Sequence, residues 1–339
     1  MDMTIKVVGS YPPLIRMRTG SYSLDHACGN PYTNEWGMPL RSLYELYGPP
    51  ESGKTTLGQH IGAMINPKST ILMAALEQVD QNYMIGVMAA AGFEGKVEFP
   101  EFQTDKGKWL GHAQMLTNVV NRLGRDEDVS CLILDSVAAI VPPAREDGVI
   151  GEGFMADRAK FMKDLTSRVE AKLMNRATPA VFIAINHVTD SLDPRNRGSV
   201  TPGGTGMKFH GAIRINLWRK EIFPRVDNAK EETRLMKGFV SEGTVEKNRF
   251  GGRGRKFRLY LVPGRGIHLG MGAMFDCINL KMAERTETGT IKIDKVSAGR
   301  IGAFVTAAYE RHEEKFAPFF ELLDGYHPDL AEVDDGGEG

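Results

Sequence analysis

The segment that decides the fold covers residues 43 to 56 and reads Leu43-Tyr44-Glu45-Leu46-Tyr47-Gly48-Pro49-Pro50-Glu51-Ser52-Gly53-Lys54-Thr55-Thr56. An apolar run is followed by Gly-x-x-x-x-Gly-Lys-Thr and then by a segment compatible with a helix. This order of strand, loop and helix is the one a phosphate-binding loop needs. Consecutive backbone N–H groups of such a loop, with the next helix N-terminus, form a concave anion site. The alternative is an incidental glycine-rich turn. The position of the loop directly after a predicted strand argues against that alternative.

Each position of this loop has an expected role. We expect the Lys54 side chain to reach the β- and γ-phosphates of a nucleotide and the Thr55 hydroxyl to bind Mg²⁺. Glu51 is a weak candidate for chemistry, because side chains of such a loop mostly point away from the phosphates. The residues expected around the phosphates are Gly48, Pro49, Pro50, Glu51, Ser52, Gly53, Lys54, Thr55 and Thr56.

The composition is that of an ordinary soluble chain. Of 339 residues, 42% are apolar and 25% charged, and the formal net charge is −1. We expect one large domain and a smaller one, because single cores rarely grow beyond roughly 250–300 residues. No run approaches the roughly 18 apolar residues of a membrane helix, so we expect a cytoplasmic protein with no membrane partner. The three cysteines lie far apart, which predicts a reducing compartment with neither zinc site nor disulfide.

Charge is unevenly distributed along the chain. Residues 246–258 hold six basic residues and one acid, whereas residues 329–339 hold five acids and no base. A basic stripe beside an acidic tail is typical of a polyanion-binding surface that the tail can screen. The alternatives are a solvated basic hairpin and a disordered terminus.

Apolar runs alternate with helical stretches in the first part of the chain. We expect strands at residues 69–76, 129–134 and 180–185, and helices at 82–92 and 111–125. This alternation predicts an α/β fold with a mostly parallel central sheet flanked by helices.

Later segments differ, and they set the expected division of the chain. Strands are predicted at residues 212–217, 243–246 and 257–262 with only loops between them, which suggests antiparallel additions to one side of the sheet. Residues 20–38 are predicted as a capped turn and a loop. We expect four parts: an N-terminal arm at 1–19, the large domain at 20–262, a small α+β domain at 263–325, and an acidic tail at 326–339.

Two carboxylates follow predicted strands. Asp135 ends the apolar run 129–134, where an acid can hold Mg²⁺ through water beside the phosphate loop. Glu77 follows the strand at 69–76, so its carboxylate can orient a water that attacks the γ-phosphate. The alternative for Glu77 is an ordinary surface residue in a loop.

Together these features resemble the bacterial RecA-type homologous recombinases and their phage relatives, from Thr19 to at least Val262. Seven matching segments follow one another in order and at similar spacing. They are Thr19-Gly20-Ser21-Tyr22-Ser23-Leu24-Asp25, residues 48–56, Asp135-Ser136-Val137-Ala138-Ala139, Ile185-Asn186-His187, Thr201-Pro202-Gly203-Gly204, Lys208-Phe209 and Lys247-Asn248-Arg249.

The resemblance implies a homo-oligomeric, helical filament on single-stranded DNA that uses ATP and Mg²⁺ and pairs the strand with homologous double-stranded DNA. Single-strand-binding or loader proteins are possible further partners. The resemblance makes Glu77 the catalytic glutamate and places Asp80 and Tyr83 at the nucleotide, with Tyr83 stacked on adenine. The alternative for Tyr83 is a core residue of its helix.

The resemblance also implies two DNA-binding loops. Residues 148–154 and Met155 fall on the first, and Lys160 stands where the family has a DNA-contacting arginine. Residues 188–202 fall on the second and are too polar and too long for a simple connection, so Arg195 and Arg197 can meet phosphates. Leu192 is either a wedge between bases or a local packing contact. Further residues expected at DNA are Gly203, Gly204 and Lys208.

Three more residues are expected to couple or complete the ATP site. His187 ends the strand before the second loop, where most bacterial members have glutamine, and it can sense the γ-phosphate; a structural histidine is the alternative. Lys247 and Arg249 match two lysines that reach the ATP of the neighbouring subunit, so that hydrolysis follows assembly.

The chain departs from the family pattern in two ways, and two other functions remain as alternatives. Only 18 residues precede Thr19, fewer than in the family's helical arm, and the second loop has no aromatic residue. An oligomeric helicase or regulatory paralogue of the same fold would lack the paired DNA loops. A small-molecule P-loop kinase would need a lid and an acceptor pocket, and it would have no use for Lys247 and Arg249.

Overall fold

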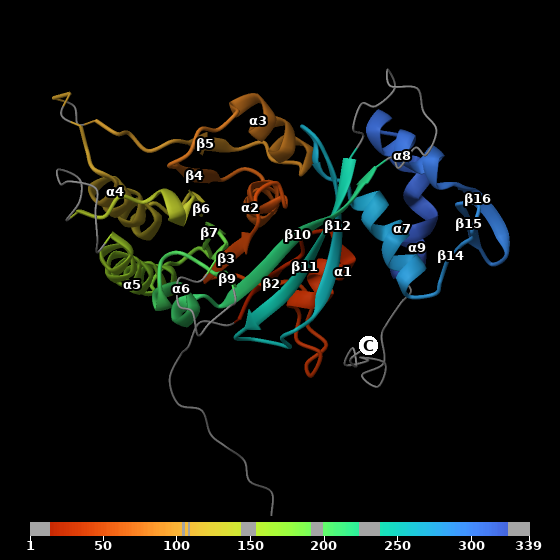
Figure 1. Ribbon diagram of the computed structural model, residues 1–339, viewed down its shortest axis with the longest axis horizontal. Coiled ribbons are helices and arrows are strands. Elements are labelled where there is room, and N and C mark those ends of the chain that lie inside the picture. Colours follow the sequence, from red (N-terminus) through yellow and green to blue (C-terminus); the bar gives the residue numbers. More distant parts are fainter. Residues whose placement is uncertain are drawn as a thin grey trace, which may run out of the picture.

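The computed structural model describes residues 14–103, 106–107, 109–143, 154–190, 199–223 and 238–324 (Figure 1). A nine-stranded sheet forms the centre, in the order β13-β12-β11-β10-β3-β7-β6-β4-β5. Its first six strands in the chain are β3 (Ser42–Gly48), β4 (Thr70–Ala75), β5 (Lys96–Glu98), β6 (Val129–Asp135), β7 (Val181–His187) and β10 (Ile213–Phe223). All six run parallel. The predicted α/β class with a mostly parallel sheet is confirmed.

Helices cover both faces of this sheet, which explains the near-continuous apolar strands. On one face lie α1 (Tyr22–Cys28), α2 (Lys54–Ile65) and α3 (Gln81–Ala90), which bury Leu24, Leu57 and Met84. On the other face lie α4 (His112–Arg125), α5 (Phe154–Met174) and α6 (Thr205–His210). The apolar spacing in α4 has its expected effect, because Met115, Val119 and Leu123 are buried.

The direction of β10 differs from the expectation. We expected antiparallel additions from residue 212 onward, but β10 pairs parallel to β3, with Ile213 opposite Tyr44. The reason is α6, which returns the chain to the amino edge of the sheet before β10 begins. Only β11 (Gly238–Asn248), β12 (Lys256–Val262) and β13 (Gly266–Ile267) add in antiparallel fashion.

The N-terminal segment differs as well. Residues 20–25 were expected as a turn, but the chain forms α1 from Tyr22, because the Asp25 carboxylate accepts the Thr19 N–H and hydroxyl at 2.8 Å and fixes the entry to the helix. Before and after α1, β1 (Arg16–Met17) pairs with β2 (Met38–Pro39). The rest of the predicted arm, residues 1–13, lies outside the described residues.

A smaller C-terminal unit packs against the end of the sheet (Figure 1). It contains α7 (Leu269–Asn279), the three-stranded sheet β14 (Glu284–Arg285), β15 (Thr290–Ile293) and β16 (Val296–Arg300), α8 (Ile301–Glu310) and α9 (Ala317–Asp324). Its aromatic core of Phe304, Phe316 and Phe319 continues into Tyr260 of β12. The predicted tail, residues 326–339, lies outside the described residues. Among the described helices, none is long and apolar enough to cross a bilayer.

Candidate nucleotide and DNA site

The phosphate loop connects β3 to α2, as its sequence pattern predicts. Gly48 allows close approach of β10, since a Cβ there would lie 1.9 Å from the Leu217 carbonyl oxygen. Gly53 adopts a left-handed conformation with φ of 87° directly before α2. Glu51 points outward: its carboxylate is 80% exposed and pairs with Arg219 at 3.0 Å. This geometry leaves the backbone N–H groups of the loop and of the first turn of α2 as the anion-binding elements.

Lys54 is folded over the loop that it is expected to serve. Its ammonium donates to the Pro49 carbonyl at 2.6 Å and to the Ser52 hydroxyl at 3.4 Å. Burial lowers the pKa of Lys54, and the carboxylates of Asp135 and Glu77 oppose that shift. The cation therefore lies between the loop and the two strand-end acids.

Thr55 and Asp135 meet at the end of β6. The Thr55 hydroxyl donates to Asp135 Oδ2 at 2.8 Å. Burial raises the pKa of Asp135, and the bond from Thr55 opposes the rise. The Thr55 hydroxyl and the Asp135 carboxylate are hard-oxygen donors that lie together beside the phosphate loop, so their chemistry fits Mg²⁺, with Thr55 as a ligand and Asp135 acting through water.

Glu77, Ser136 and His187 form a cluster at the same edge of the sheet. The Ser136 hydroxyl donates to Glu77 Oε1, and His187 Nε2 lies 3.3 Å from the same oxygen. His187 is in register with Gly48 across β7 and β3. The ends of β6 and β7 supply Asp135 and His187, Glu77 follows β4 by two residues, and Lys54 begins the helix after the phosphate loop.

The two residues expected at the base of the nucleotide lie beside this edge. The Tyr83 hydroxyl is 3.2 Å from the Thr56 hydroxyl, so the ring stands next to the phosphate-loop helix. The Asp80 carboxylate caps α3 by accepting the N–H groups of Asn82 and Tyr83. Asp80 therefore fixes the start of the helix that carries Tyr83.

Sequence reasoning missed a buried polar network beneath the site. Glu45 of β3 is fully buried and accepts from Asn186 Nδ2 at 2.9 Å and from Arg214 Nε of β10. Asn186 Nδ2 also donates to the Pro202 carbonyl at 2.8 Å. The network joins three strands to the end of the second loop. Glu45 and Arg214 were visible as single charges within apolar runs.

The predicted DNA loops are described only in part. Strands β8 (Thr189–Asp190) and β9 (Ser199–Val200) pair antiparallel and form the stem of the second loop. Residues 191–198, and with them Leu192, Arg195 and Arg197, lie outside the described residues. So do the first loop up to residue 153 and the side chain of Met155.

Behind the second loop, α6 packs tightly on α5. Gly203 and Gly204 have φ of 92° and 67°, and a Cβ on Gly204 would lie 2.6 Å from the Ala159 Cβ. At Gly206 a Cβ would lie 2.8 Å from the Lys163 Cα. These glycines let the two helices meet almost backbone to backbone, with Lys208 exposed on α6.

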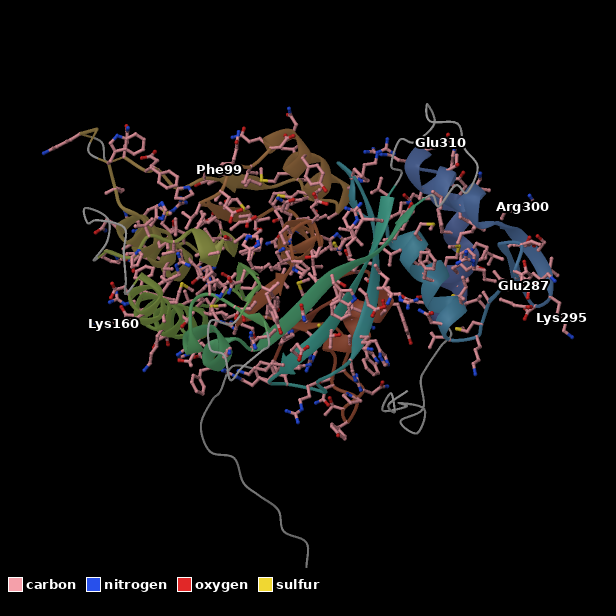
Figure 2. The ribbon with its side chains drawn as sticks, viewed as in Figure 1. Phe99, Lys160, Glu287, Lys295, Arg300 and Glu310 are labelled. Carbon is pink, nitrogen blue, oxygen red and sulfur yellow. The ribbon has the colours of Figure 1, made fainter. Side chains whose placement is uncertain are left out.

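A groove of about 700 Å³ runs along α5. Figure 2 shows Lys160 at this end of the molecule, remote from Lys295 and Arg300 of the C-terminal unit. Lys163 and Ser167 extend the face of Lys160 at helical spacing, a signal that sequence reasoning had available and did not use. The groove is lined by Pro142, Pro143, Asp157, Lys160, Phe161, Lys163, Asp164, Ser167 and His210.

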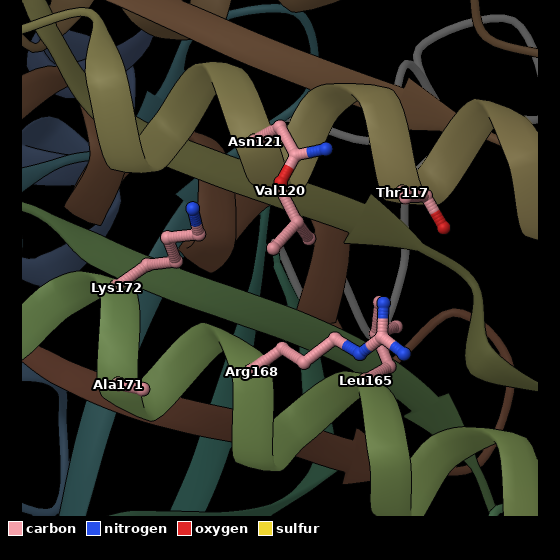
Figure 3. A pocket seen from close by; sticks show the side chains of 7 residues that line it. All are labelled: Thr117, Val120, Asn121, Leu165, Arg168, Ala171 and Lys172. Atoms are coloured by element: carbon pink, nitrogen blue, oxygen red, sulfur yellow. The ribbon is translucent and has the colours of Figure 1, made fainter.

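A second hollow of about 250 Å³ lies between α4 and α5 (Figure 3). Thr117, Val120 and Asn121 line it from α4, and Leu165 and Arg168 are among the residues of α5 that face them. The Arg168 guanidinium pairs with Asp164 one turn away. None of the residues expected at nucleotide or DNA lines this hollow.

Lys247 and Arg249 lie away from the phosphate loop of their own chain. Lys247 of β11 pairs with Arg214 of β10, and Arg214 pairs with Glu45 of β3. Glu45 lies three residues before Gly48, the first residue of the phosphate loop. Its ammonium donates to the carbonyls of Lys208 and Phe209 at 2.7 and 2.9 Å. Arg249 donates to Glu170 at 2.7 Å and to the Phe209 carbonyl at 3.2 Å. Both cations thus sit on the C-terminal end of α6.

Two further basic residues of the stripe make contacts within the chain. Arg255 donates to the His26 carbonyl at 2.9 Å, and Arg258 pairs with Glu242 at 3.1 Å. These contacts favour the alternative of a solvated hairpin for this part of the stripe.

Comparison with known proteins points to one family. Residues 11–243 match the family described as RecA N-terminal domain. The chain is 27% identical over 258 residues to Protein RecA of Frankia alni, which covers 76% of this chain and 68% of that protein. It is 28% identical over 267 residues to Protein RecA of Thermus thermophilus, with coverage of 78% and 71%. For Protein RecA of Arthrospira platensis the identity is 27% over 276 residues, with coverage of 81% and 67%.

Proposed function

The chain belongs to the RecA family of ATP-hydrolysing recombinases, and from this premise we propose that it forms a helical filament on single-stranded DNA and exchanges that strand with homologous duplex. The proposal depends on one observation above all. The phosphate loop, the Thr55–Asp135 pair, the Glu77–His187 contact and the stem of the second loop converge at one edge of the sheet. We propose a cytoplasmic location, without membrane partners and with loader proteins as further candidates.

ATP would be held by the backbone N–H groups of the loop, by Lys54 and by Thr55. Bound Mg²⁺, held by Thr55 and Asp135, supplies charge neutralisation on the phosphates. Glu77 accepts a proton from the attacking water and orients it. Ser136 and His187 both contact Glu77 Oε1, which fixes that oxygen and leaves Oε2 for the water.

The same residues can connect nucleotide to DNA. His187 touches Glu77 on one side and precedes the second loop on the other, while Asn186 holds Pro202 at the far end of that loop. A γ-phosphate that changes the Glu77–His187 contact therefore acts on both ends of the loop stem. This provides the differential contact that a ligand-driven switch needs.

Assembly would complete the site. Lys247 and Arg249 face away from their own phosphate loop, and we propose that they neutralise the γ-phosphate charge in the adjacent subunit. The groove along α5 supplies Lys160 and Lys163, and α6 supplies Lys208, for the DNA backbone. Backbone contacts of this kind give little sequence preference.

The test is a strand-exchange assay with homologous and heterologous duplex, run beside ATP hydrolysis with and without single-stranded DNA. We expect hydrolysis that rises sharply with the single strand and joint molecules only with the homologous duplex. Directional unwinding without pairing would favour the helicase alternative. Hydrolysis that ignores DNA and follows a small-molecule acceptor would favour the kinase.

A further inference from the structure

The C-terminal end of α6 is closed by side chains from elsewhere in the fold. A helix leaves its last carbonyls without helical partners. Here Lys247 of β11 and Arg249, the residue after β11, donate to the carbonyls of Lys208, Phe209 and His210. The two cations share the Phe209 carbonyl, so their positions depend on each other. Because α6 begins directly after the second loop, that loop and the cations lie at opposite ends of one short helix.

Glu170 of α5 ties this arrangement to a second helix. Its Oε1 accepts Arg249 Nη1 at 2.7 Å, and its Oε2 lies 2.7 Å from His210 Nδ1. One carboxylate thus bridges the end of α6 and the end of β11. Glu170 continues the α5 face of Lys160, Lys163 and Ser167 at helical spacing. The residues expected at DNA and the holder of Arg249 therefore share one helix.

Electrostatics explains why a carboxylate is needed here. Burial lowers the pKa of Lys247, the positive charges of Arg249 and Arg214 lower it further, and Glu170 opposes them. Burial alone would raise the pKa of Glu170, but hydrogen bonds from Arg249 and His210 outweigh it and the pKa is lowered. Glu170 is therefore ionised at neutral pH, and its charge offsets the mutual repulsion of the clustered cations.

We propose that Glu170 is a positioning residue that holds Arg249, and through the shared α6 carbonyls Lys247, in the pose in which both are presented to the ATP of the adjacent subunit. This inference rests on the proposed function. The geometry leaves Arg249 available to a neighbouring subunit, because its side chain is 40% exposed while it contacts Glu170. An ammonium has three donors, and within the described chain Lys247 uses two.

Mixed filaments provide the test, because they separate the subunit that gives the cations from the one that turns over. The donor subunit carries Glu77→Gln, which keeps both cations and blocks its own hydrolysis. The acceptor subunit carries Lys247→Ala with Arg249→Ala, which keeps Glu77 and the phosphate loop. Each alone is inactive in DNA-stimulated hydrolysis, and the mixture should recover activity.

Glu170→Gln is then added to one parent at a time. In the donor it should lower the recovered kcat by about two- to fivefold, the range of a half-exposed ion pair, with KM for ATP unchanged. In the acceptor it should change nothing. Glu170→Asp in the donor should give an intermediate loss, and it replaces Glu170→Gln if that variant does not fold.

The matched control is Glu98→Gln in the donor. Glu98 accepts Arg122 Nη1 at 2.8 Å with 40% exposure, against 2.7 Å and 34% for Glu170, but it lies on β5 at the far edge of the sheet. The control should leave kcat unchanged. An equal loss in donor and acceptor, or no loss in the donor, would overturn the role of Glu170. If the parent mixture recovers no activity at all, the trans arrangement of cations is wrong, and the role of Glu170 is rejected with it.

Discussion

At the scale of single residues, the proposed chemistry depends on how one carboxylate is held. Glu77 is not buried, with a side chain 45% exposed, yet Ser136 and His187 both contact its Oε1. A general base must be oriented before its basicity matters. Here the orientation comes from Ser136, the residue after β6, and from His187, the last residue of β7. These two strands are neighbours in the sheet.

Glu77→Gln should therefore lower ATP turnover by at least about 100-fold while ATP and DNA binding persist, because the amide keeps the shape but cannot accept the proton. Steady-state hydrolysis and filter binding measure the two properties. Glu101→Gln, the same change at an exposed carboxylate after the adjacent strand β5, is the control and should be silent. Normal turnover in Glu77→Gln would remove Glu77 from the mechanism.

A second residue-scale prediction concerns Gly204. Gly204→Ala should destabilise the fold by roughly 2 kcal/mol more than Gly92→Ala, and it should weaken DNA binding. Both glycines have positive φ, so both alanines carry backbone strain. Only Gly204 faces a close neighbour, the Ala159 Cβ at 2.6 Å, whereas a Cβ on Gly92 meets nothing within 4 Å.

Urea unfolding of the two variants measures the difference, to which the close contact and the ψ of −148° at Gly204 both contribute. Equal destabilisation would mean that the close contact between α6 and α5 adjusts without cost.

At the scale of elements, the second loop is a ribbon stem whose two ends are tied to the sheet. Asn186 connects Pro202 to the buried Glu45, and Arg214 completes that pair from β10. A buried charge pair is costly to break because the remaining charge is left unpaired. The stem is therefore anchored to a buried charge pair in the central sheet.

The loop itself is tested by charge. Arg195→Ala with Arg197→Ala should weaken single-stranded DNA binding and reduce the slope of log K against log salt by roughly 0.7 for each lost phosphate contact. Fluorescence anisotropy at several salt concentrations measures the slope. Lys68→Ala with Arg125→Ala removes the same charge from two exposed positions, one after α2 and one at the last residue of α4, and should leave the slope intact. An unchanged slope in the loop variant would place the phosphate contacts elsewhere.

At the scale of the whole molecule, the C-terminal unit is joined to the core through a buried carboxylate. Asp276 of α7 accepts the Ser23 N–H of α1 at 3.1 Å. Burial raises the pKa of Asp276 to about 7, although the bonds from Ser23 and the charge of Arg258 oppose the rise. The protonated form is therefore the one that the folded junction favours.

This gives a prediction about pH. The folded protein keeps the Asp276 proton up to pH near 7, whereas the unfolded chain releases it near pH 4, so this group makes stability fall as pH rises between those values. Asp276→Asn should remove that slope and stabilise the protein above pH 7 by up to roughly 4 kcal/mol, at about 1.4 kcal/mol per pKa unit. Urea unfolding from pH 5 to 8 measures it. If the free energy of unfolding changed with pH in the same way for both proteins, the raised pKa of Asp276 would be contradicted.

The sequence predicted those parts of the molecule that follow from local pattern and from the geometry of parallel sheets. The convergence of Lys54, Asp135 and Glu77 could be expected, because the carboxyl ends of parallel strands meet at one edge. The direction of β10 could not, because it depends on where α6 returns the chain. Glu45 with Arg214 could not be paired either, since nothing in a single sequence indicates that two charges from strands far apart along the chain will neutralise each other.

The phosphate loop and the Lys247–Arg249 pair occupy different surfaces of the same subunit. If the pair completes the ATP site of the next copy, as we propose, contacts between copies are head to tail, and a rotation that does not close gives an open helix. The last subunit at one terminus then holds a nucleotide that no neighbour completes. That terminus should keep its ATP, while interior subunits consume theirs. Growth and shortening would therefore occur at opposite extremities, which gives the polymer a built-in direction along the strand.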